Sequence, residues 1–198
     1  MKIVLIGASG TIGKEVGIAL SSEHEVIAVT RQSSDLRLDL ESQDSIRALF
    51  ENILCFDAIV CVAGNAKYGE FQTLTEDDYY IGLKNKLMGQ VNLVRIALDY
   101  IRPGGVIVLT GGTASRKPFA KGGASISMVN AALEGFVRAV AEETQGKIRI
   151  NLVAPGWAKE TLEAFQMESE EGIPAKEMAP AYLNAIAGES TGKIFDTN

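Results

Sequence analysis

The chain has 198 residues and a formal net charge of −6, and 46% of its residues are hydrophobic. This length supports one well-buried core and is short for two ordinary domains, and the composition is typical of a soluble globular protein. The sequence has no apolar run of membrane-spanning length, no basic stripe, and only two cysteines with one histidine, so we expect no membrane partner, no nucleic-acid partner, no metal site and a cytoplasmic location.

The first predicted elements are a strand and a helix joined by a glycine-rich turn. Four consecutive branched apolar residues, Ile3 to Ile6, indicate a strand that is buried on both faces. Gly7, Gly10 and Gly13 then form the pattern G-x-x-G-x-x-G, and helical periodicity begins at Ile12. The positive end of a helix at such a turn attracts phosphate groups. We therefore expect the diphosphate of a dinucleotide to be held by Gly7, Ser9, Gly10, Thr11, Ile12 and Gly13.

Two other glycine motifs do not fit these residues. A P-loop would need glycine in place of Ala8 and serine or threonine in place of Glu15. A hydrolase nucleophile elbow would need glycine in place of Thr11, two residues after Ser9, and a histidine late in the chain, whereas His24 comes far too early. The predicted strand before the glycines and the predicted helix after them support a dinucleotide-binding turn.

The end of the second predicted strand, residues 25–30, indicates which dinucleotide is bound. An NAD-preferring site or a methyltransferase would place a carboxylate here to hold ribose hydroxyls, whereas this chain has Thr30 and Arg31. A guanidinium group at this point suits the 2′-phosphate of NADP. We therefore expect NADP as the preferred cofactor, with NAD as the second option.

The remaining elements alternate between strands and helices. Strands are predicted at 36–40, 57–63, 105–110, 148–153 and 193–195, and helices at 42–52, 75–100 and 124–144. Ser42 can cap the first of these helices, and Thr75 with Asp78 forms a capping box for the second. This order predicts an α/β fold of three α/β/α layers, a doubly wound parallel sheet in a single domain spanning 1–198. Its ligand would lie at the carboxyl ends of the strands, and the Glu-rich segment 158–177 would be a lid or surface excursion.

Five further motifs follow along the chain. They are Asp39-Leu40, Cys61-Val-Ala-Gly64, Asn85-Lys-Leu-Met-Gly89, Asn151-Leu-Val-Ala-Pro-Gly156 and Thr191-Gly192. Together with the glycine turn they resemble the short-chain dehydrogenase/reductase family over nearly the full chain, although Thr11 stands where most single-domain members have their middle glycine. The resemblance implies a Rossmann fold that binds NAD(P). It assigns the adenine ring to Asp39 and Leu40 and the backing of the nicotinamide to Pro155 and Gly156. The further cofactor-binding residues are Ala63, Gly64, Asn85 and Trp157.

The catalytic positions depart from that family. Its Y-x-x-x-K segment aligns with Ile126 to Asn130, so isoleucine replaces the tyrosine and asparagine the lysine. In the family the lysine lowers the tyrosine pKa from about 10, which isoleucine and asparagine cannot reproduce. The family's serine falls near Gly112-Thr113. The residues that the resemblance leaves for the catalytic set are Asn85, Thr113 and Asn130, and further hydroxyls near the expected site are those of Ser115, Ser125, Ser127 and Tyr68.

Two groups of charged residues are assigned to the surface. Lys84 and Lys86 flank Asn85 on the predicted helix, so we expect both to point away from its face into solvent. The glutamates of 158–177 are expected to form a solvated acidic face, and if they line the mouth of the site they would disfavour a polyanionic substrate. Trp157 follows the nicotinamide motif, where it would either wall the pocket or anchor the lid.

These observations predict an NADP(H)-binding oxidoreductase of the short-chain dehydrogenase/reductase type, acting on an unknown small carbonyl compound or alcohol with an atypical proton donor. The alternative is a catalytically inactive dinucleotide sensor or partner-binding protein, which the Ile126 and Asn130 replacements favour. An isomerase or dehydratase fits less well, because it also needs a tuned acid or base. The family resemblance and the small residues of helices 75–100 and 124–144 predict a homodimer or homotetramer.

Overall fold

The computed structural model describes residues 1–31, 36–118 and 122–197, and its framework is a parallel β-sheet. Within these residues the sheet has six strands in the order β2-β1-β3-β4-β5-β6. Their bounds are β1 Lys2–Ile6, β2 Glu25–Val29, β3 Phe56–Cys61, β4 Ile101–Thr110, β5 Arg149–Ala154 and β6 Ile194–Asp196. The chain adds β2 on one side of β1 and all later strands on the other, so the winding direction reverses beside β1. This arrangement confirms the predicted doubly wound sheet.

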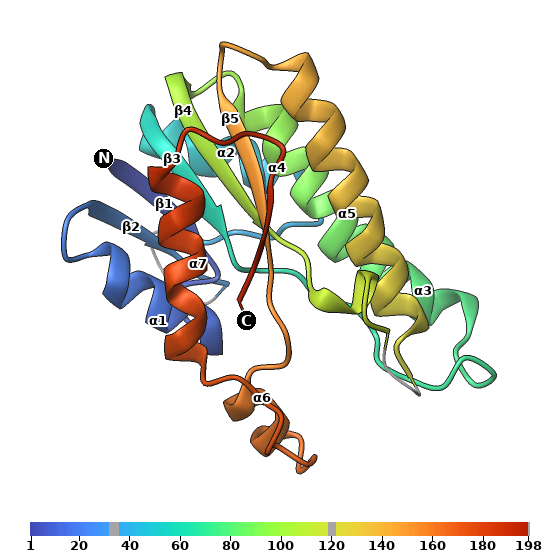
Figure 1. Cartoon of the computed structure of the whole chain (residues 1–198). Coiled ribbons are helices and arrows are strands. Elements are labelled where there is room, and N and C mark those ends of the chain that lie inside the picture. The colour runs from blue at the N-terminus through green and yellow to red at the C-terminus, as the bar shows by residue number, and fades with distance from the viewer. Residues whose placement is uncertain (32–35, 119–121, 198) are drawn as a thin grey trace.

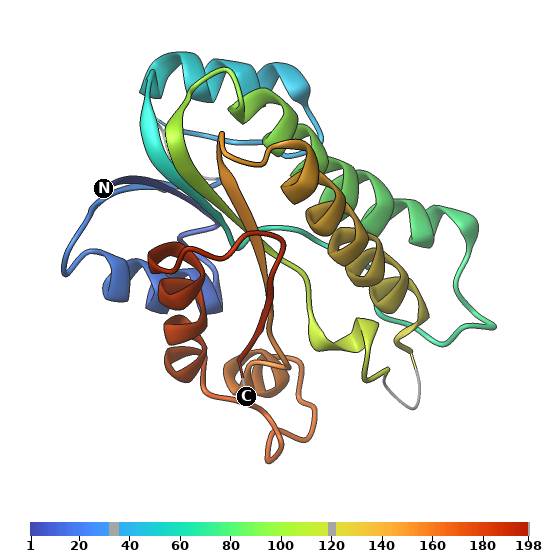
Figure 2. The same cartoon turned by 45° about the horizontal axis from the view of Figure 1, so that its top comes forward.

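Helices cover both faces of the sheet, which confirms the three predicted layers (Figures 1 and 2). One face carries α1 (Thr11–Leu20) and α7 (Ala175–Ala187), which pack against each other. The other face carries α2 (Gln43–Ile53), α4 (Gly89–Ala97) and α5 (Ala124–Glu143). As predicted, Ser42 caps α2, because its side chain accepts a hydrogen bond from the N–H of Ser45 at 3.2 Å.

The central strand β1 is buried on both faces because successive side chains point to opposite sides. Ile3 and Leu5 belong to the apolar core beneath α1 and α7, and Val4 and Ile6 to the core beneath α2, α4 and α5. Strand β2, which was also predicted to be buried, lies at the edge of the sheet and is only partly covered. The glycine turn therefore begins at a strand that is enclosed on both faces.

The predicted helix 75–100 is divided into three segments. They are α3 (Glu76–Ile81), the π-helical η1 (Gly82–Met88) and α4. The predicted capping box is confirmed, since the Asp78 carboxylate accepts from the N–H of Thr75 at 2.9 Å and the Thr75 hydroxyl accepts from the N–H of Asp78. The π-helical segment was not predicted. Asn85 and Lys86 lie in this segment, and π-helical turns often occur at functional sites.

Two predictions about elements were wrong or incomplete. Residues 36–40 do not form a strand, and the part of this region that the structure describes has a single bridge between Thr30 and Arg37. The chain then turns into α2, because the N–H of Asp39 donates to Ser45 Oγ. Helix α7 was missed. Its apolar side chains are buried, but Pro180 lies inside it and weakens the helical signal.

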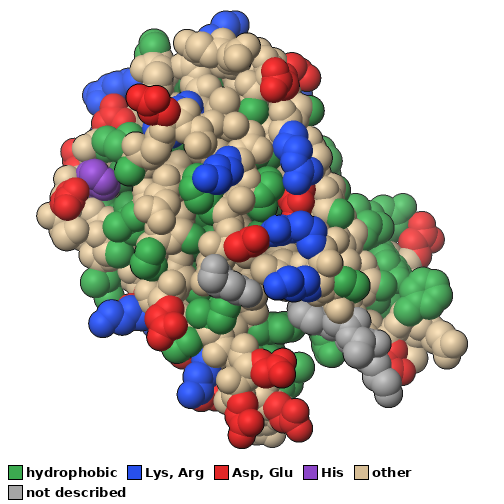
Figure 3. Space-filling view, viewed as in Figure 1, with side chains coloured by type: hydrophobic (Ala, Val, Ile, Leu, Met, Phe, Trp, Pro, Cys, Tyr) green, Lys and Arg blue, Asp and Glu red, His purple; other side chains and the backbone are tan. Residues whose placement is uncertain are grey.

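The predicted excursion 158–177 projects from one end of the fold and contains α6 (Lys159–Ala164). Its base is closed by two backbone hydrogen bonds of 2.9 Å, from Lys159 to Ile173 and from Ile173 to Trp157. The Glu160 carboxylate accepts the N–H of Ala175 at the start of α7. Figure 3 shows acidic side chains gathered at the tip, which fits a solvated face. None of the helices in the described residues has the length and apolarity needed to cross a membrane.

Candidate functional site

Two connected hollows lie at the carboxyl ends of the strands, where the sequence predicts the ligand site. The first has a volume of about 270 Å³ and lies at the ends of β1, β2 and β3. The second has a volume of about 840 Å³ and extends from the start of α1 to the excursion around α6. Gly10, Gly64 and Asn65 line both, so the hollows form one groove.

The groove collects nearly all the residues predicted from the sequence. The first hollow is lined by Gly7, Ser9, Gly10, Arg31, Leu40, Ala63, Gly64 and Asn85. The second is lined by Gly10, Thr11, Ile12, Gly13, Gly64, Thr113, Asn130, Pro155, Gly156 and Trp157. Asp39 lines neither hollow, because its carboxylate accepts the N–H of Glu41 at 3.0 Å, and Leu38 takes its place in the lining. Its assignment to the adenine ring stays a prediction.

The glycine turn brings α1 close against the end of β1. Gly7 has a φ of 88°, a conformation that favours glycine, and its N–H donates to Val29 on β2 at 3.0 Å. A Cβ on Gly13 would lie 2.0 Å from the carbonyl oxygen of Gly7, so only glycine fits there. Helix α1 starts at Gly10 without a side-chain cap. Its first N–H groups therefore remain available to an anionic ligand.

Asn85 joins three segments at the first hollow. Its side chain is buried, with Oδ1 accepting the N–H of Asn65 at 2.7 Å and Nδ2 donating to Glu41 Oε1 at 2.8 Å. These bonds hold the loop after β3 against η1. The amide therefore shapes the groove, and its assignment to the catalytic set stays a prediction.

Lys86 lies in the second hollow, and the prediction that it is a solvated surface residue was wrong. It is half-buried, and its Nζ donates to the carbonyl oxygen of Gly111 at 2.7 Å. Burial lowers the pKa of Lys86 to about 8 from an ordinary value of 10.5. Lys84, two residues earlier, is exposed, and its ammonium group lies over the Tyr80 ring. On a helix with about 3.6 residues per turn, positions two apart lie on opposite sides, so the two lysines do not share one environment.

Asn130 presents a buried amide to the same hollow. The residue is 1% exposed, and neither Nδ2 nor Oδ1 has a hydrogen-bond partner among the described residues. The amide lies against the Gly112 backbone, where a Cβ would come within 2.6 Å of Nδ2. Leaving such a group unpaired costs about 1–3 kcal/mol. An amide in this state is suited to bind polar groups of a ligand.

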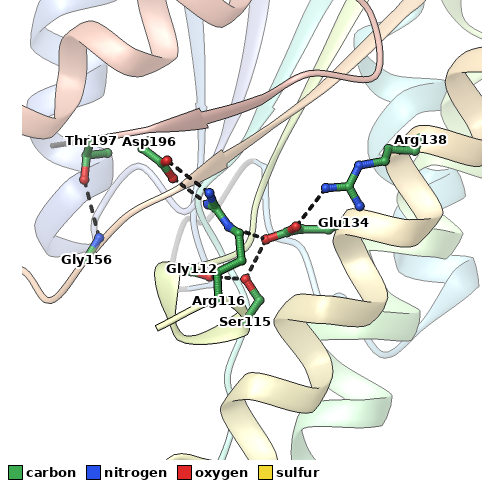
Figure 4. Close-up of polar contacts among 8 residues, drawn as sticks. All are labelled: Gly112, Ser115, Arg116, Glu134, Arg138, Gly156, Asp196 and Thr197. Carbon is green, nitrogen blue, oxygen red and sulfur yellow. Dashed lines mark hydrogen bonds and ion pairs between the residues drawn. The ribbon is translucent and has the colours of Figure 1, made fainter. Parts of the chain in front are cut away.

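The loop after β4 is fixed by an ionic network, shown in Figure 4. The buried Glu134 of α5 accepts from Ser115 Oγ at 2.5 Å, Arg116 Nε at 3.2 Å and Arg138 at 3.0 Å. Arg116 also binds the carboxylate of Asp196 on β6, an interaction that lowers the pKa of Asp196. The network ties the segment that lines the groove to α5 and to the C-terminal strand, and it occupies the Ser115 hydroxyl.

The other hydroxyls differ in their access to the groove. Thr113 lines it, and its N–H donates to Pro155 at 3.0 Å. Tyr68 also lines it, and its ring meets the Trp157 ring edge-on at 6.2 Å between centroids. The Oγ atoms of Ser125 and Ser127 are buried without partners in the described part of the chain, but neither residue is in the lining. Trp157 therefore walls the hollow and also anchors the excursion through its backbone.

The motif that begins at Asn151 connects the groove to the end of the chain. Asn151 is fully buried, and its Nδ2 donates to the carbonyl oxygens of Ala185 and Ser190 at 3.0 and 2.8 Å. Its Oδ1 accepts the N–H of Lys193 at 3.1 Å. The N–H of Gly156 then donates to Thr197 Oγ1 at 3.4 Å (Figure 4). The asparagine is structural, and it places Pro155 and Gly156 beside the groove.

Comparison with known proteins identifies this arrangement. The family model described as enoyl-(acyl carrier protein) reductase matches residues 13–187, which is most of the chain. The chain belongs to the short-chain dehydrogenase/reductase family. The six-stranded parallel sheet found in the described residues is the Rossmann fold of this family, and the matching family model is that of a reductase.

Three relatives illustrate the range of similarity. The crystal structure of the protein lin1944 from Listeria innocua has 34% identity and a TM-score of 0.94, and the match covers 100% of both chains. A small-chain dehydrogenase in complex with NADPH has 27% identity and a TM-score of 0.86, with 99% of this chain and 95% of that chain covered. Hydroxynaphthalene reductase arp2 from Aspergillus fumigatus is 28% identical over 77% of this chain, which spans 58% of that protein's length.

Proposed function

We propose that this protein binds NADP(H) in the groove and reduces a small apolar carbonyl compound. The observation that carries the proposal is the continuous groove that runs from Arg31, past the uncapped start of α1, to the unpaired amide of Asn130. In this proposal the glycine turn holds the diphosphate, and Asn130 bonds the ribose next to the nicotinamide. The bound cofactor supplies the hydride, so the chain must supply a proton.

The preference for NADP is supported at the first hollow. Arg31 lines it, and the Thr30–Arg37 bridge brings the backbone of a second arginine to the same place. Among the described residues of the lining there is no carboxylate that would compete for ribose hydroxyls. The relative solved with NADPH is consistent with this choice.

The substrate class is inferred from the walls of the second hollow. Six of its lining residues have aromatic or aliphatic side chains, namely Tyr68, Ile81, Ile126, Trp157, Phe165 and Met167. Such walls suit an uncharged apolar carbonyl compound, and the acidic tip of the excursion disfavours a polyanion. We take the excursion 158–177 as the lid of this site. The name of the Aspergillus relative, a reductase of a hydroxynaphthalene, makes aromatic aldehydes and ketones the first compounds to test.

Calorimetric titration with NADPH and NADH tests the cofactor assignment. We expect NADPH to bind at least tenfold more tightly, and Arg31→Ala to remove most of that difference because the 2′-phosphate loses its counter-charge. Arg47→Ala is the matched control, since Arg47 is an exposed arginine on α2 away from the groove lining. Equal or tighter binding of NADH by the unmodified protein would refute the preference.

The second candidate function is a dinucleotide sensor without catalytic activity. The observation in its favour is Ile126, which faces the groove at the aligned position of the family's tyrosine. NADPH oxidation with a panel of aromatic aldehydes and ketones separates the two functions. Micromolar NADPH binding combined with no reduction of any compound would favour the sensor.

We also propose that the protein forms a homodimer or homotetramer through α3, η1, α4 and α5. Tyr80, Met88 and Met128 lie on these elements and are exposed by 40, 44 and 41% in the single chain. Covering them with a second copy would bury apolar surface. Light scattering at micromolar concentration should give a multiple of 21.2 kDa, and a monomer mass would contradict this arrangement.

A further inference from the structure

The position of Lys86 is determined by the backbone around it. A Cβ on Gly64 would lie 2.7 Å from Lys86 Cγ, so the aliphatic stem runs directly against the Gly64 backbone at the end of β3. The ammonium group reaches past this glycine to the carbonyl oxygen of Gly111, at the end of β4. The lysine is therefore held across the ends of two adjacent strands, with its charged end at the second hollow.

The Lys86 ammonium retains donors for a ligand. An ammonium group has three N–H bonds, and the Gly111 carbonyl is the hydrogen-bond partner that it has among the described residues. No carboxylate in this part of the chain forms an ion pair with it. The segment Gly112-Thr113, to which the family's serine aligns, follows immediately after its carbonyl partner. The free N–H bonds therefore lie where the resemblance places the reacting end of a substrate.

The surroundings of Lys86 allow its ammonium group to lose and regain a proton near neutral pH. Burial lowers its pKa to about 8, and the titratable group that acts on it electrostatically is Cys61 on β3. Burial raises the pKa of that thiol to about 12, so it stays neutral and offers no counter-charge. The loop after β3 contributes the exposed Lys67 and Tyr68, while Glu41 is bonded to the neighbouring Asn85. The remaining residues around the Lys86 ammonium are Thr110 to Thr113, Ile126 and Asn130, and none of their side chains titrates near neutral pH.

Other candidate donors are less suitable. The Ser115 hydroxyl is bonded to Glu134, and the Asn130 amide is not an acid. Tyr182 is fully buried outside the groove lining, and burial raises its pKa. Thr113 has a hydroxyl at the groove, but an ordinary alcohol is a poor acid near pH 7. An efficient general acid has a pKa near the working pH, and Lys86 combines this property with access.

We propose that Lys86 is the proton donor of the reduction, acting directly on the carbonyl oxygen of the substrate. The inference rests on the proposed reductase function. As the carbonyl carbon accepts a hydride from the cofactor, the C=O π bond breaks and its electron pair moves to oxygen. One Nζ–H bond of Lys86 then breaks and an O–H bond forms, which gives the alcohol and a neutral amine. The amine takes a proton from water before the next cycle.

A titration without substrate or cofactor tests the required protonation behaviour. In protein labelled with [13Cε]lysine, the signal that is lost in Lys86→Met should titrate near pH 8. The control variant Lys84→Met removes a lysine two residues away on the same π-helical segment, exposed to solvent. A Lys86 signal that titrates near pH 10.5 would overturn the inference.

Kinetics with NADPH and 4-nitrobenzaldehyde test the role itself. Lys86→Met and Lys86→Arg should both lower kcat at least 100-fold, because neither side chain can donate a proton near neutral pH, while the Kd for NADPH changes less than fivefold. In the unmodified protein kcat should fall as pH rises above 8, and Lys84→Met should keep both the rate and the profile.

Three outcomes separate failure of the donor assignment from failure of the proposed function. If either Lys86 variant keeps kcat within fivefold, or its pH profile matches that of the unmodified protein, Lys86 is not the donor and the reductase assignment stands. If the unmodified protein does not bind NADPH, the proposed function itself fails. If it binds NADPH and reduces neither this aldehyde nor the aromatic ketones, the reductase assignment and the donor assignment fail together.

Discussion

Replacing Lys86 with methionine should stabilise the folded protein at pH 7. The pKa of Lys86 is about 8 in the fold, against an ordinary value of 10.5. Each pH unit corresponds to about 1.4 kcal/mol, so the charged lysine disfavours the folded state by about 3.5 kcal/mol. Methionine keeps most of the apolar stem but loses the charged hydrogen bond to Gly111, worth about 1.5 kcal/mol. We therefore expect the free energy of unfolding to rise by about 2 kcal/mol.

The pH dependence of this gain gives the sharper test. Between pH 8 and 10.5 the unfolded chain keeps the proton on residue 86 after the folded chain has released it, so the stability of the unmodified protein rises with pH in this window. Below pH 8 both states are protonated and the difference between the two proteins is constant. The advantage of Lys86→Met should therefore be complete at pH 7 and should shrink as pH rises from 8 towards 10.5.

Urea unfolding of both proteins at pH 6.5, 7.5, 8.5 and 9.5 measures this difference directly. Lys84→Met serves as the control, because Lys84 is exposed and its substitution should give a small difference with no trend across these pH values. If Lys86→Met has no stabilising effect at pH 7, or if its effect does not change with pH, the ammonium group is solvated and the reasoning about its burial is refuted.

Two further substitutions test the supports of the groove. Gly13→Ala should destabilise the fold by about 3 kcal/mol or more, because its Cβ would lie 2.0 Å from the Gly7 carbonyl oxygen. The control is Gly135→Ala on α5, where nothing lies within 4 Å of the added Cβ, and it should be neutral or stabilising by up to about 1 kcal/mol. Urea unfolding measures both variants, and equal effects of Gly13→Ala and Gly135→Ala would contradict the packing argument. Glu134→Gln should lower stability by roughly 1–3 kcal/mol by weakening three hydrogen bonds to a buried carboxylate. Glu142→Gln, an exposed position of α5, should change the melting temperature little, and a similar loss in both variants would count against the network.

Local patterns in the sequence predicted the framework well. The apolar run Ile3 to Ile6 and the spacing of the glycines identified β1 and the turn, because burial and close backbone approach restrict the residue types at these positions. The same holds for the caps at Ser42 and Thr75, where one side chain satisfies a nearby N–H. Residues 36–40 show the limit of such patterns, since alternating leucines are buried there without a strand.

The site was less predictable where long-range geometry decides the environment of a side chain. The sequence separates Glu134 from Ser115 by 19 residues and Arg116 from Asp196 by 80, so the network could not be inferred from spacing. Lys86 was misassigned because a residue next to the inward-facing Asn85 was taken to point into solvent, whereas adjacent residues on a helix lie only about 100° apart. The glycine at position 64 was the available signal, since its missing side chain is what makes room for the lysine stem.

The position of Lys86 gives a physical reason for a neutral side chain at residue 130. Asn130 lies against Gly112, and the Lys86 ammonium binds the adjacent carbonyl of Gly111. A lysine at position 130 would bring a second cation to this segment, and at an effective dielectric of about 20 two charges about 4–8 Å apart repel by about 2–4 kcal/mol.

We therefore expect that Asn130→Lys does not restore the family's arrangement. The repulsion favours loss of a proton, so the pKa of Lys86 should fall by at least about one unit below its value in the unmodified protein. In the [13Cε]lysine titration the Lys86 signal should then move well below pH 8. A Lys86 pKa that stays near 8 in this variant would mean that the two side chains point apart, and the neutral amide at position 130 would need another explanation. If the pKa falls, the asparagine is the residue that keeps Lys86 protonated at neutral pH, and the loss of the family's lysine is a consequence of where this chain holds its positive charge.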